Sequence, residues 1–436
     1  GPKTWWPRLN PRRMPTTSAR KRNMPTLSNL MLGQNTQIHT SLVHKRLKKK
    51  KRNAMTYSFQ SKLPNNSASI FSVMTALAVK HQAINLSQGF PDYPVDPVLT
   101  DSISHYLKLG HNQYAPMAGV PVLREQISAK FKRVHGLDID ADSEITVTAG
   151  ATQALFTAMS ATIHAGDEVI VFEPAYDSYA VTIALLGGKV VPIRLNAPDY
   201  QIDWAEVASK VNARTRLIIV NNPNNPTGKV LSATDVQQLA NIIQNSNALL
   251  LSDEVYEHLV YDGIAPQTLL SHPVLRERTF VVASFGKLLH ATGWKIGYCV
   301  AAPQLMAEFR KVHQYNVFSV HTPTQWAIAD YLKDATHYEG LPAFFQQKRD
   351  FLVHELQNSR FEVAESQGTY FLNLNYRAIS DLPEQAFAEQ LITEHGIATI
   401  PMAAFYHDGH NQQYLRLCFA KKQDTLEQAV KVLQSI

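Results

Sequence analysis

Residues 215–254 read TRLIIVNNPNNPTGKVLSATDVQQLANIIQNSNALLLSDE and contain a strand, a helix and a second strand in succession. An apolar run at 215–220 ends in a loop rich in Asn and Pro. Residues 232–246 then place apolar side chains at helical spacing, and a second apolar run follows at 248–254. This βαβ order is typical of a parallel sheet. Both runs are nearly continuous rather than alternating, which indicates strands buried on both faces.

The same alternation extends to both sides of this unit. Helical patterns occupy 151–163 and 176–186, and five more apolar runs predict strands at 144–148, 167–173, 189–195, 279–284 and 296–301. We therefore predict an α/β fold with a mostly parallel, seven-stranded sheet in a large domain. Past residue 322, two helical stretches precede a looser mixture of strands and helices, which predicts a smaller α+β domain.

The charge of the chain is segregated. The 436 residues carry a net charge of +6, but residues 1–54 hold 14 Lys or Arg and no Asp or Glu. The remaining 28 basic and 36 acidic residues make the body acidic. Composition predicts a disordered basic tail at 1–54, with Gly1-Pro2 as a tag scar and Met55 as a plausible native start. Its basic composition leaves four interpretations open: an arm that binds nucleic acid or a membrane surface, a transit peptide, a nuclear signal, or a solvated extension without a function.

Composition also excludes several classes of protein. Cys299 and Cys418 lie far apart in apolar, strand-like stretches, which predicts buried thiols in a reducing compartment, the cytoplasm. No secretory apolar segment and no run of about 18 apolar residues is present, so neither a secretory signal nor a membrane span is predicted. The histidines show no metal-ligand spacing, so we expect no metal.

Polar residues follow the ends of four predicted strands, where open α/β sheets bind their ligands. They are the turn Gly150-Ala151-Thr152, then Asn225 in NNPNNPTG, then Asp253 and Tyr256 in SDEVY, and finally Ser284, Lys287 and Lys295 in SFGKLLHATGWK. The small residues of the turn at 150–152, and the helix that begins there, suit a bound phosphate. A lysine at an apolar strand end suits an amine nucleophile. Each feature alone fits a packing turn, a loop, a helix cap or a surface lysine, but together they predict one site.

These motifs, in this order, resemble the fold-type I pyridoxal-phosphate aminotransferases. The closer similarity is to bacterial methionine aminotransferases and to the kynurenine–oxoglutarate and glutamine transaminase K group. It rests further on LSQGFPDYP, NQYAPMAGVPVLRE, EPAYDSY, KVHQYNVFSVHTPTQ and YLRLCFAKK. The resemblance runs from about Gln60 to the C-terminus. It implies an N-terminal arm with part of the small domain at 55–91, a large cofactor domain at 92–325 and the rest of the small domain at 326–436, so that both chain ends build the small domain.

The resemblance also implies the roles of residues at the cofactor ring. Lys287 would form a Schiff base with the cofactor aldehyde and, once freed, would move a proton between substrate and cofactor. Asp253 would pair with the pyridine nitrogen, which keeps the ring an electron sink. Asn225 and Tyr256 would hydrogen-bond the ring oxygen, and Tyr176 would stack on the ring.

Further residues match positions that bind phosphate and substrate. Ser284, Lys295 and the turn Gly150-Ala151-Thr152 would hold the phosphate, and Lys295 would give a point charge where much of the family has arginine. Tyr114 would reach the phosphate of the other subunit, so the site would be shared in a homodimer. Arg416 would grip the substrate α-carboxylate as a fork, with Gly89 and Asn225 against the same group.

The resemblance therefore implies ping-pong transamination of a neutral, methionine-like or aromatic amino acid with a 2-oxo acid acceptor. No second arginine for a distal carboxylate is identifiable, and site-region aromatics predict an apolar side-chain pocket, formed by Tyr114, Tyr176, Phe318, Tyr370 and Phe371. A cysteine-S-conjugate β-lyase is the alternative enzyme, since the same chemistry can expel a β-leaving group. A transcription regulator is the other alternative, but residues 1–54 show no helical DNA reader, so we expect no specific nucleic-acid partner.

Overall fold

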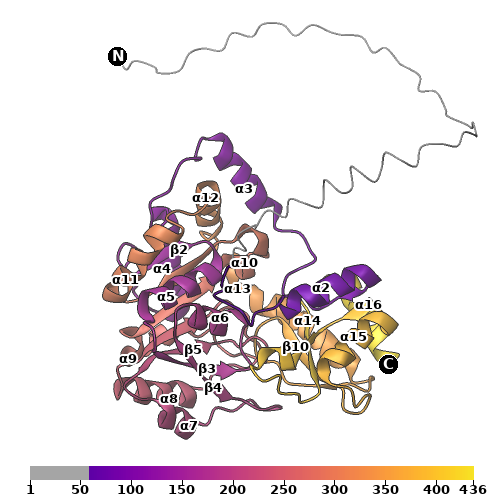
Figure 1. The fold of residues 1–436 in the computed structure, drawn as a ribbon. Coiled ribbons are helices and arrows are strands. Elements are labelled where there is room, and N and C mark those ends of the chain that lie inside the picture. The colour runs from indigo at the N-terminus through magenta and orange to yellow at the C-terminus, as the bar shows by residue number, and fades with distance from the viewer. Residues whose placement is uncertain (1–57) are drawn as a thin grey trace, which may run out of the picture. The chain divides into compact units, whose positions relative to one another are not determined.

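A sheet of seven strands forms the centre of the fold, in the order β2-β8-β7-β6-β5-β3-β4. Figure 1 labels four of these strands, β2, β3, β4 and β5. The computed structural model describes residues 58–436. The strands are β2 (Ile145–Thr148), β3 (Glu168–Glu173), β4 (Lys189–Arg194), β5 (Thr215–Asn221), β6 (Leu249–Asp253), β7 (Thr279–Ser284) and β8 (Gly297–Val300). Strands β4, β3, β5, β6 and β7 are parallel, and β8 runs antiparallel to both β7 and β2.

Successive residues of the strands pack into two different cores. Val169 and Val171 of β3 lie in one apolar cluster, and Ile170 and Phe172 lie in the other. The first cluster includes side chains from α5 (Gly150–Thr162), α6 (Ser178–Leu185) and α11 (Pro303–Asn316). The second includes side chains from α4 (Pro121–His135), α7 (Trp204–Lys210), α8 (Ala233–Gln244) and α9 (Pro273–Arg276). Helices therefore cover both faces, which explains the nearly continuous apolar strands.

Local sequence signals account for several helix boundaries. Helix α8 begins with a capping box, in which the side chains of Ser232 and Asp235 each bond the other's backbone N–H. Helix α4 starts with Pro121 in its first turn and ends at Gly136, which adopts the left-handed conformation that glycine tolerates. Other short elements of this part are α3 (Pro97–Lys108), η1 (Leu269–Ser271), α10 (Phe285–Leu288), η2 (Thr292–Trp294), α12 (Thr322–Tyr331) and α13 (Thr336–Glu339).

A second, antiparallel sheet follows the large one in the chain, in the order β12-β13-β10-β9. Its strands are β9 (Glu362–Val363), β10 (Phe371–Asn375), β12 (Ile400–Pro401) and β13 (Tyr414–Cys418). The accompanying helices are α14 (Leu341–Leu356), α15 (Glu384–His395), η3 (Met402–Phe405) and α16 (Gln423–Gln434).

Segments from near both ends of the described chain meet beside this second sheet. Strand β1 (Ile84–Asn85) pairs in parallel with β11 (Ile397–Ala398), and α2 (Ile70–His81) packs on α15. Figure 1 shows the indigo α2 beside the yellow C-terminal helices. The α/β fold with a mostly parallel seven-stranded sheet and a smaller α+β part is confirmed. The domain boundaries after residues 91 and 325 stay predictions.

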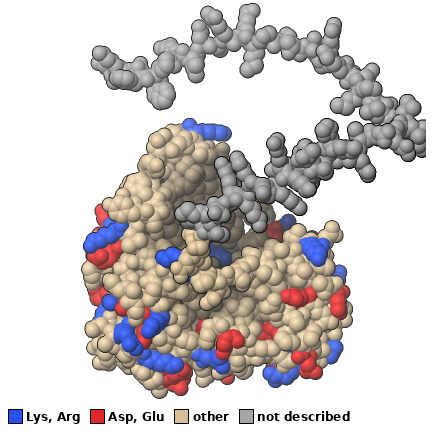
Figure 2. All heavy atoms as spheres, in the orientation of Figure 1, with Lys and Arg blue, Asp and Glu red and all other residues tan. Residues whose placement is uncertain are grey.

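Some sequence predictions lie outside what the structure describes. The predictions for the basic tail at 1–54 fall on residues outside 58–436. Within 58–436, no helix is long and apolar enough to cross a bilayer, and no group of three or more His, Cys, Asp or Glu is placed to hold a metal ion. Figure 2 shows Lys and Arg interspersed with Asp and Glu over the visible face, with no continuous basic surface.

Candidate active site

The ends of neighbouring strands bring the predicted site residues together. In the sheet, β5, β6 and β7 lie side by side and end at Asn221, Asp253 and Ser284. Gly297, the first residue of the antiparallel strand β8, pairs with both Ser284 and the last residue of β2. The loops that follow β2, β5, β6 and β7, and the one that precedes β8, therefore converge on one edge of the sheet.

A cavity of about 160 Å³ lies at this edge. It is lined by Ala151, Thr152, Leu155, Tyr176, Asn221, Asn225, Asp253, Val255, Tyr256, Ser284, Lys287, Thr292 and Lys295. The structure thus gathers most of the predicted cofactor residues in one place. A larger cavity of about 430 Å³ lies behind the Asn-Pro loop and holds none of the predicted lysines.

The groups at one end of the cavity are suited to bind an anion. Helix α5 begins at Gly150 with no side-chain cap, so its first N–H groups lack an intrahelical partner. Gly150 has a φ of +78°, and a Cβ added to it would stand 3.2 Å from Lys295 Nζ. A helix N-terminus and an ammonium group that meet at a glycine form a cradle for a phosphate. Ser284 adds a hydroxyl to the same cavity.

Asp253 is a buried carboxyl at the end of β6. It is 3% exposed, and Tyr179 donates a hydrogen bond to its Oδ2 over 2.5 Å. Burial raises the pKa of Asp253 to about 6, while the bond from Tyr179 acts in the opposite direction. A buried carboxylate with this environment favours a cationic partner, such as a protonated ring nitrogen.

Lys287 follows β7 on the short helix α10. Its Nζ donates hydrogen bonds to Gly89 O at 2.7 Å and to the Tyr370 hydroxyl at 2.9 Å. Burial lowers the pKa of Lys287 to about 8, to which the nearby positive charges of Arg416 and Lys295 also contribute. A lysine with a lowered pKa supplies the neutral amine that nucleophilic attack and proton abstraction require.

Arg416 projects from β13 toward the loop of Asn225. Its guanidinium donates to Asn225 Oδ1 at 2.8 Å and to Ser87 O at 3.0 Å, and it lies 3.8 Å from the centre of the Phe371 ring. The residue is 1% exposed, and burial lowers the pKa of Arg416 to about 10. Its Nε has no hydrogen-bond partner, and it forms no ion pair within residues 58–436. A buried cation without an anion suits a carboxylate ligand.

Four predicted site residues are not part of the cavity lining: Gly150 and Arg416, described above, and Tyr114 and Gly89. Tyr114 is 84% exposed, and its ring packs edge-on against Phe318, 5.4 Å away. Its role in a partner's site stays a prediction. Gly89 lies beside the cavity, where its carbonyl accepts from Lys287 and an added Cβ would stand 3.0 Å from Phe371.

Sequence reasoning misses Tyr179 and four residues of the cavity lining, and it assigns Tyr370 only in part. The four lining residues are Leu155, Asn221, Val255 and Thr292. Tyr179 bonds Asp253 and stands three residues after Tyr176 in EPAYDSY, yet nothing local marks it as a partner of that carboxylate. Asn221 lines the cavity and belongs to the quoted Asn-Pro stretch, in which the motif assigns a site role to Asn225 but not to Asn221. The sequence predicts Tyr370 as an aromatic of the side-chain pocket but does not predict its hydrogen bond with Lys287.

Comparisons with known proteins agree with this arrangement. Residues 81–433 match the family "Aminotransferase class I and II". The methionine aminotransferase of Escherichia coli (strain K12) is 49% identical over 378 residues, which cover 86% of this chain and 98% of that protein. The human kynurenine–oxoglutarate transaminase 1 is 33% identical, over 80% of this chain and 92% of its own length.

Solved structures show the same similarity. YbdL from Escherichia coli, for which a methionine aminotransferase function is reported, has a TM-score of 0.86 and 49% identity, over 87% of this chain and all of its own. N-succinyldiaminopimelate aminotransferase from Mycobacterium tuberculosis has a TM-score of 0.82 and 36% identity, with the same coverage of both chains. The chain therefore belongs to the class I and II aminotransferases, as its motifs predict.

Proposed function

We propose that this aminotransferase uses pyridoxal 5′-phosphate to transaminate a neutral L-amino acid, methionine-like or aromatic, with a 2-oxo acid as acceptor in a ping-pong cycle. The observation that carries the proposal is the placement of three groups around one cavity. Lys287 and the buried carboxyl of Asp253 line it, and Arg416 contacts Asn225, which also lines it.

The residues present fit this cofactor. The N-terminus of α5, Lys295 and Ser284 would hold its phosphate, and Asp253, kept in place by Tyr179, would hold its ring nitrogen protonated. Tyr176 would stack on the ring, and Asn225 and Tyr256 would bond its hydroxyl oxygen. When bound, the cofactor supplies an electron sink that makes the substrate α C–H bond acidic.

The side chains of this protein supply the remaining steps. Arg416 and Asn225 would bind and orient the substrate α-carboxylate, with Gly89 against the same group. The amine of Lys287 would take the proton from the substrate α-carbon and return it at the other end of the transfer. Burial around Lys287 favours the neutral amine near pH 8, which is the form able to accept that proton.

The neutral side chain of the substrate is supported by what surrounds Arg416. Its guanidinium lies among three aromatic rings, those of Phe371, Phe71 and Phe405, at 3.8, 5.4 and 5.2 Å. The cavity lining holds lysines but no arginine for a distal carboxylate. The similarity to the methionine aminotransferase and to kynurenine–oxoglutarate transaminase 1 supports the same class of substrate.

The proposal includes a homodimer with shared active sites. Tyr114 supports it, because this tyrosine is 84% exposed and stands away from its own cavity, where it is free to enter another. We also propose the cytoplasm as the compartment, because Cys299 and Cys418 are free, buried thiols.

Absorption spectroscopy of the purified protein with pyridoxal 5′-phosphate tests the function. Addition of methionine should replace the band of the aldehyde form of the cofactor with that of its amine form, and a 2-oxo acid should reverse the change. Lys287→Ala should abolish turnover, while Lys311→Ala, on the exposed face of α11, should not. Borohydride reduction should attach the cofactor to Lys287, and attachment at Lys295 would contradict the assignment. Pyruvate and ammonia from a cysteine conjugate, without the methionine response, would favour the β-lyase instead.

A further inference from the structure

Tyr370 contacts the catalytic lysine through its hydroxyl. The side chain is fully buried, and its hydroxyl accepts a hydrogen bond from Lys287 Nζ at 2.9 Å. The same hydroxyl donates to Gly89 O, and Lys287 Nζ donates to that carbonyl at 2.7 Å. The three groups therefore form a closed triangle of hydrogen bonds in which both acceptors face the lysine amine.

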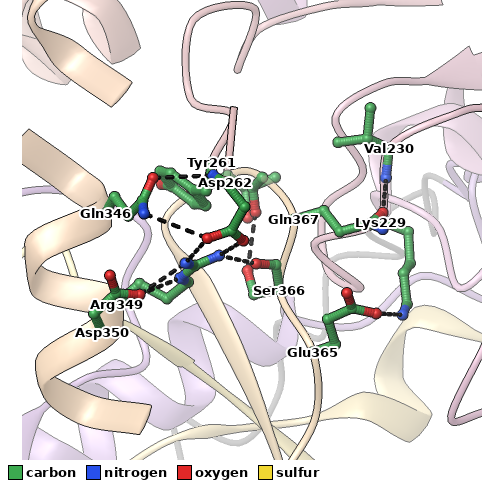
Figure 3. Close-up of polar contacts among 12 residues, drawn as sticks. Lys229, Val230, Tyr261, Asp262, Gln346, Arg349, Asp350, Glu365, Ser366 and Gln367 are labelled. Carbon is green, nitrogen blue, oxygen red and sulfur yellow. Dashed lines mark hydrogen bonds and ion pairs between the residues drawn. The ribbon is translucent and has the colours of Figure 1, made fainter. Parts of the chain in front are cut away.

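The segment that carries Tyr370 is held from several sides. Figure 3 shows that both terminal nitrogens of Arg349, on α14, donate hydrogen bonds to the carboxylate of Asp262, each at 2.6 Å. Arg349 also donates to Ser366 O at 2.8 Å. The backbone N–H groups of Gln367 and Gly368 donate to Gly228 O, in the Asn-Pro loop, at 2.8 and 2.9 Å. Contacts from α14 and from the Asn-Pro loop thus fix the chain just before Tyr370.

The residue directly before Tyr370 is held in an unfavourable backbone conformation. Thr369 has a φ of +66°, in the left-handed region that β-branched residues rarely adopt. It is fully buried, its N–H donates to Leu259 O, and its carbonyl accepts from the Tyr261 hydroxyl. Such strain persists only where surrounding contacts over-determine it, and it concentrates at functional sites. Here it turns the chain so that Tyr370 and Phe371 both contact groups of the site.

We infer that the Tyr370 hydroxyl and the Gly89 carbonyl form a seat for the Lys287 amine during the half of the cycle in which this lysine is not bonded to the cofactor. A neutral amine has two N–H groups and one lone pair. The two acceptors bind both N–H groups of the amine. The lone pair of the nitrogen therefore stays free to accept a proton. Tyr370 is in this sense a positioning residue, and the inference rests on the proposed function.

Tyr370→Phe tests the seat, because it removes one oxygen and keeps the ring. In the cofactor-free protein, pulse acetylation at a series of pH values followed by peptide mass spectrometry gives the pKa of the Lys287 amine. Loss of an acceptor disfavours the charged form, so this pKa should fall by about one unit. In the loaded enzyme, kcat for methionine should fall on the order of tenfold, while KM should stay within about twofold because Arg416 and Asn225 are untouched.

Tyr376→Phe is the matched control. Tyr376 is equally buried, follows β10 directly, and donates its hydroxyl hydrogen to Leu382 O at 2.6 Å, away from Lys287. It should lower the melting temperature at least as much as Tyr370→Phe does, yet leave both kcat and the pKa of the Lys287 amine unchanged. An unchanged amine pKa in Tyr370→Phe, or a parallel change in Tyr376→Phe, overturns the inference.

A second variant tests the inference if Tyr370→Phe folds poorly. Site-specific incorporation of 3-fluorotyrosine at position 370 keeps the hydroxyl but weakens it as an acceptor, so the amine pKa should fall by a smaller amount in the same direction. No fall overturns the inference. Failure of the proposed function is distinguishable, because wild-type protein would then show no cofactor response to amino acids, whereas failure of the seat leaves an active wild type and an equally active Tyr370→Phe.

Discussion

Asp253 and Arg416 are buried charges of opposite sign that do not pair with each other. In contrast, Lys130 and Glu257, which are also buried, form an ion pair at 2.8 Å. Burial moves the pKa of Asp253 up and that of Arg416 down, so each group is held at a cost in its charged form. Both groups are thus poised for an outside partner of opposite charge, which residues 58–436 do not supply.

Keeping the buried carboxyl of Asp253 charged costs folding free energy. We therefore predict that Asp253→Asn increases stability, by an amount that depends on pH. The folded pKa, about 6, lies above the ordinary value of 3.8, so the native state binds a proton that the unfolded state has released between these values. The charged carboxyl therefore costs no stability below about pH 3.8, and its cost grows as the pH rises from there through 6. In cofactor-free protein, Asp253→Asn should be more stable than wild type by on the order of 2 kcal/mol at pH 8.

Urea unfolding at pH 8 and pH 5 measures this effect. The advantage of Asp253→Asn should shrink at pH 5, where the wild-type carboxyl is largely protonated, and transamination should be lost at either pH. An advantage of equal size at both pH values would mean that the charge of Asp253 carries no such cost.

Arg416 predicts a loss that is common to all substrates. Arg416→Ala should lower kcat/KM by on the order of a hundredfold or more, because a bidentate pair with the α-carboxylate is lost. Every amino acid has that carboxylate, so a panel of methionine, phenylalanine and leucine should be affected alike. Arg416→Lys, which restores a point charge without the fork, should recover only part of the loss. A loss confined to one side chain would make Arg416 a specificity residue.

At the scale of elements, the start of α5 and the αL residue Lys295 meet at Gly150. Lys295 itself has a φ of +54° and follows η2, so the loop between α10 and β8 turns its ammonium back toward the helix. A Cβ added at position 150 would stand 3.1 Å from Cε and 3.2 Å from Nζ of Lys295, so the end of that side chain would have to shift away from the helix start. The anion cradle is therefore a property of two elements in contact, not of either one.

Gly150→Ala and Gly136→Ala form a matched pair that tests this cradle. Both glycines have positive φ, +78° and +69°, so alanine strains the backbone by about 1 kcal/mol at either position. An added Cβ meets Lys295 only at position 150, and nothing lies within 4 Å at position 136. Both variants should lose similar stability, but only Gly150→Ala should weaken pyridoxal 5′-phosphate binding, by about tenfold or more in a fluorescence titration. Equal affinities would remove Lys295 and the start of α5 from the phosphate site.

At the scale of the whole molecule, the active site combines parts that the chain supplies far apart. Helix α2 packs on α15 and strand β1 pairs with β11 beside the second sheet. The segment after β1 brings the carbonyls of Ser87 and Gly89 to Arg416 and Lys287. Tyr114 and Phe318 lie outside this assembly, with the tyrosine exposed. In the proposed dimer, that tyrosine completes the neighbouring site.

Mixing two inactive variants tests the shared site. Lys287→Ala and a Tyr114 variant with little activity of its own should complement as heterodimers, because one of the two sites then has both residues intact. Activity well above that of either parent is the expected result, measured after confirming heterodimers by differential tagging. Confirmed heterodimers without restored activity would place Tyr114 outside the partner's site. Homodimers of each variant, mixed without exchange, are the control.

The sequence by itself determined the alternation of strands and helices and the residues that stand at the strand ends. These features follow from local physics: apolar periodicity sets the element type, and capping residues and glycines set where elements end. The strand at 279–284 places Ser284 and Lys287 at the same edge as Asp253 because parallel neighbours end at the same side of a sheet.

The tertiary structure alone decided which distant groups touch. Arg416 meets Asn225 across 191 residues of sequence, and Tyr370 meets Lys287 across 83. It also decided that β8 enters between β2 and β7 in the antiparallel sense, and that Tyr179 bonds Asp253. No local pattern encodes these contacts, because they join residues that are distant in the sequence and meet only when strands, helices and loops pack together. That packing depends on the summed shape of the buried side chains.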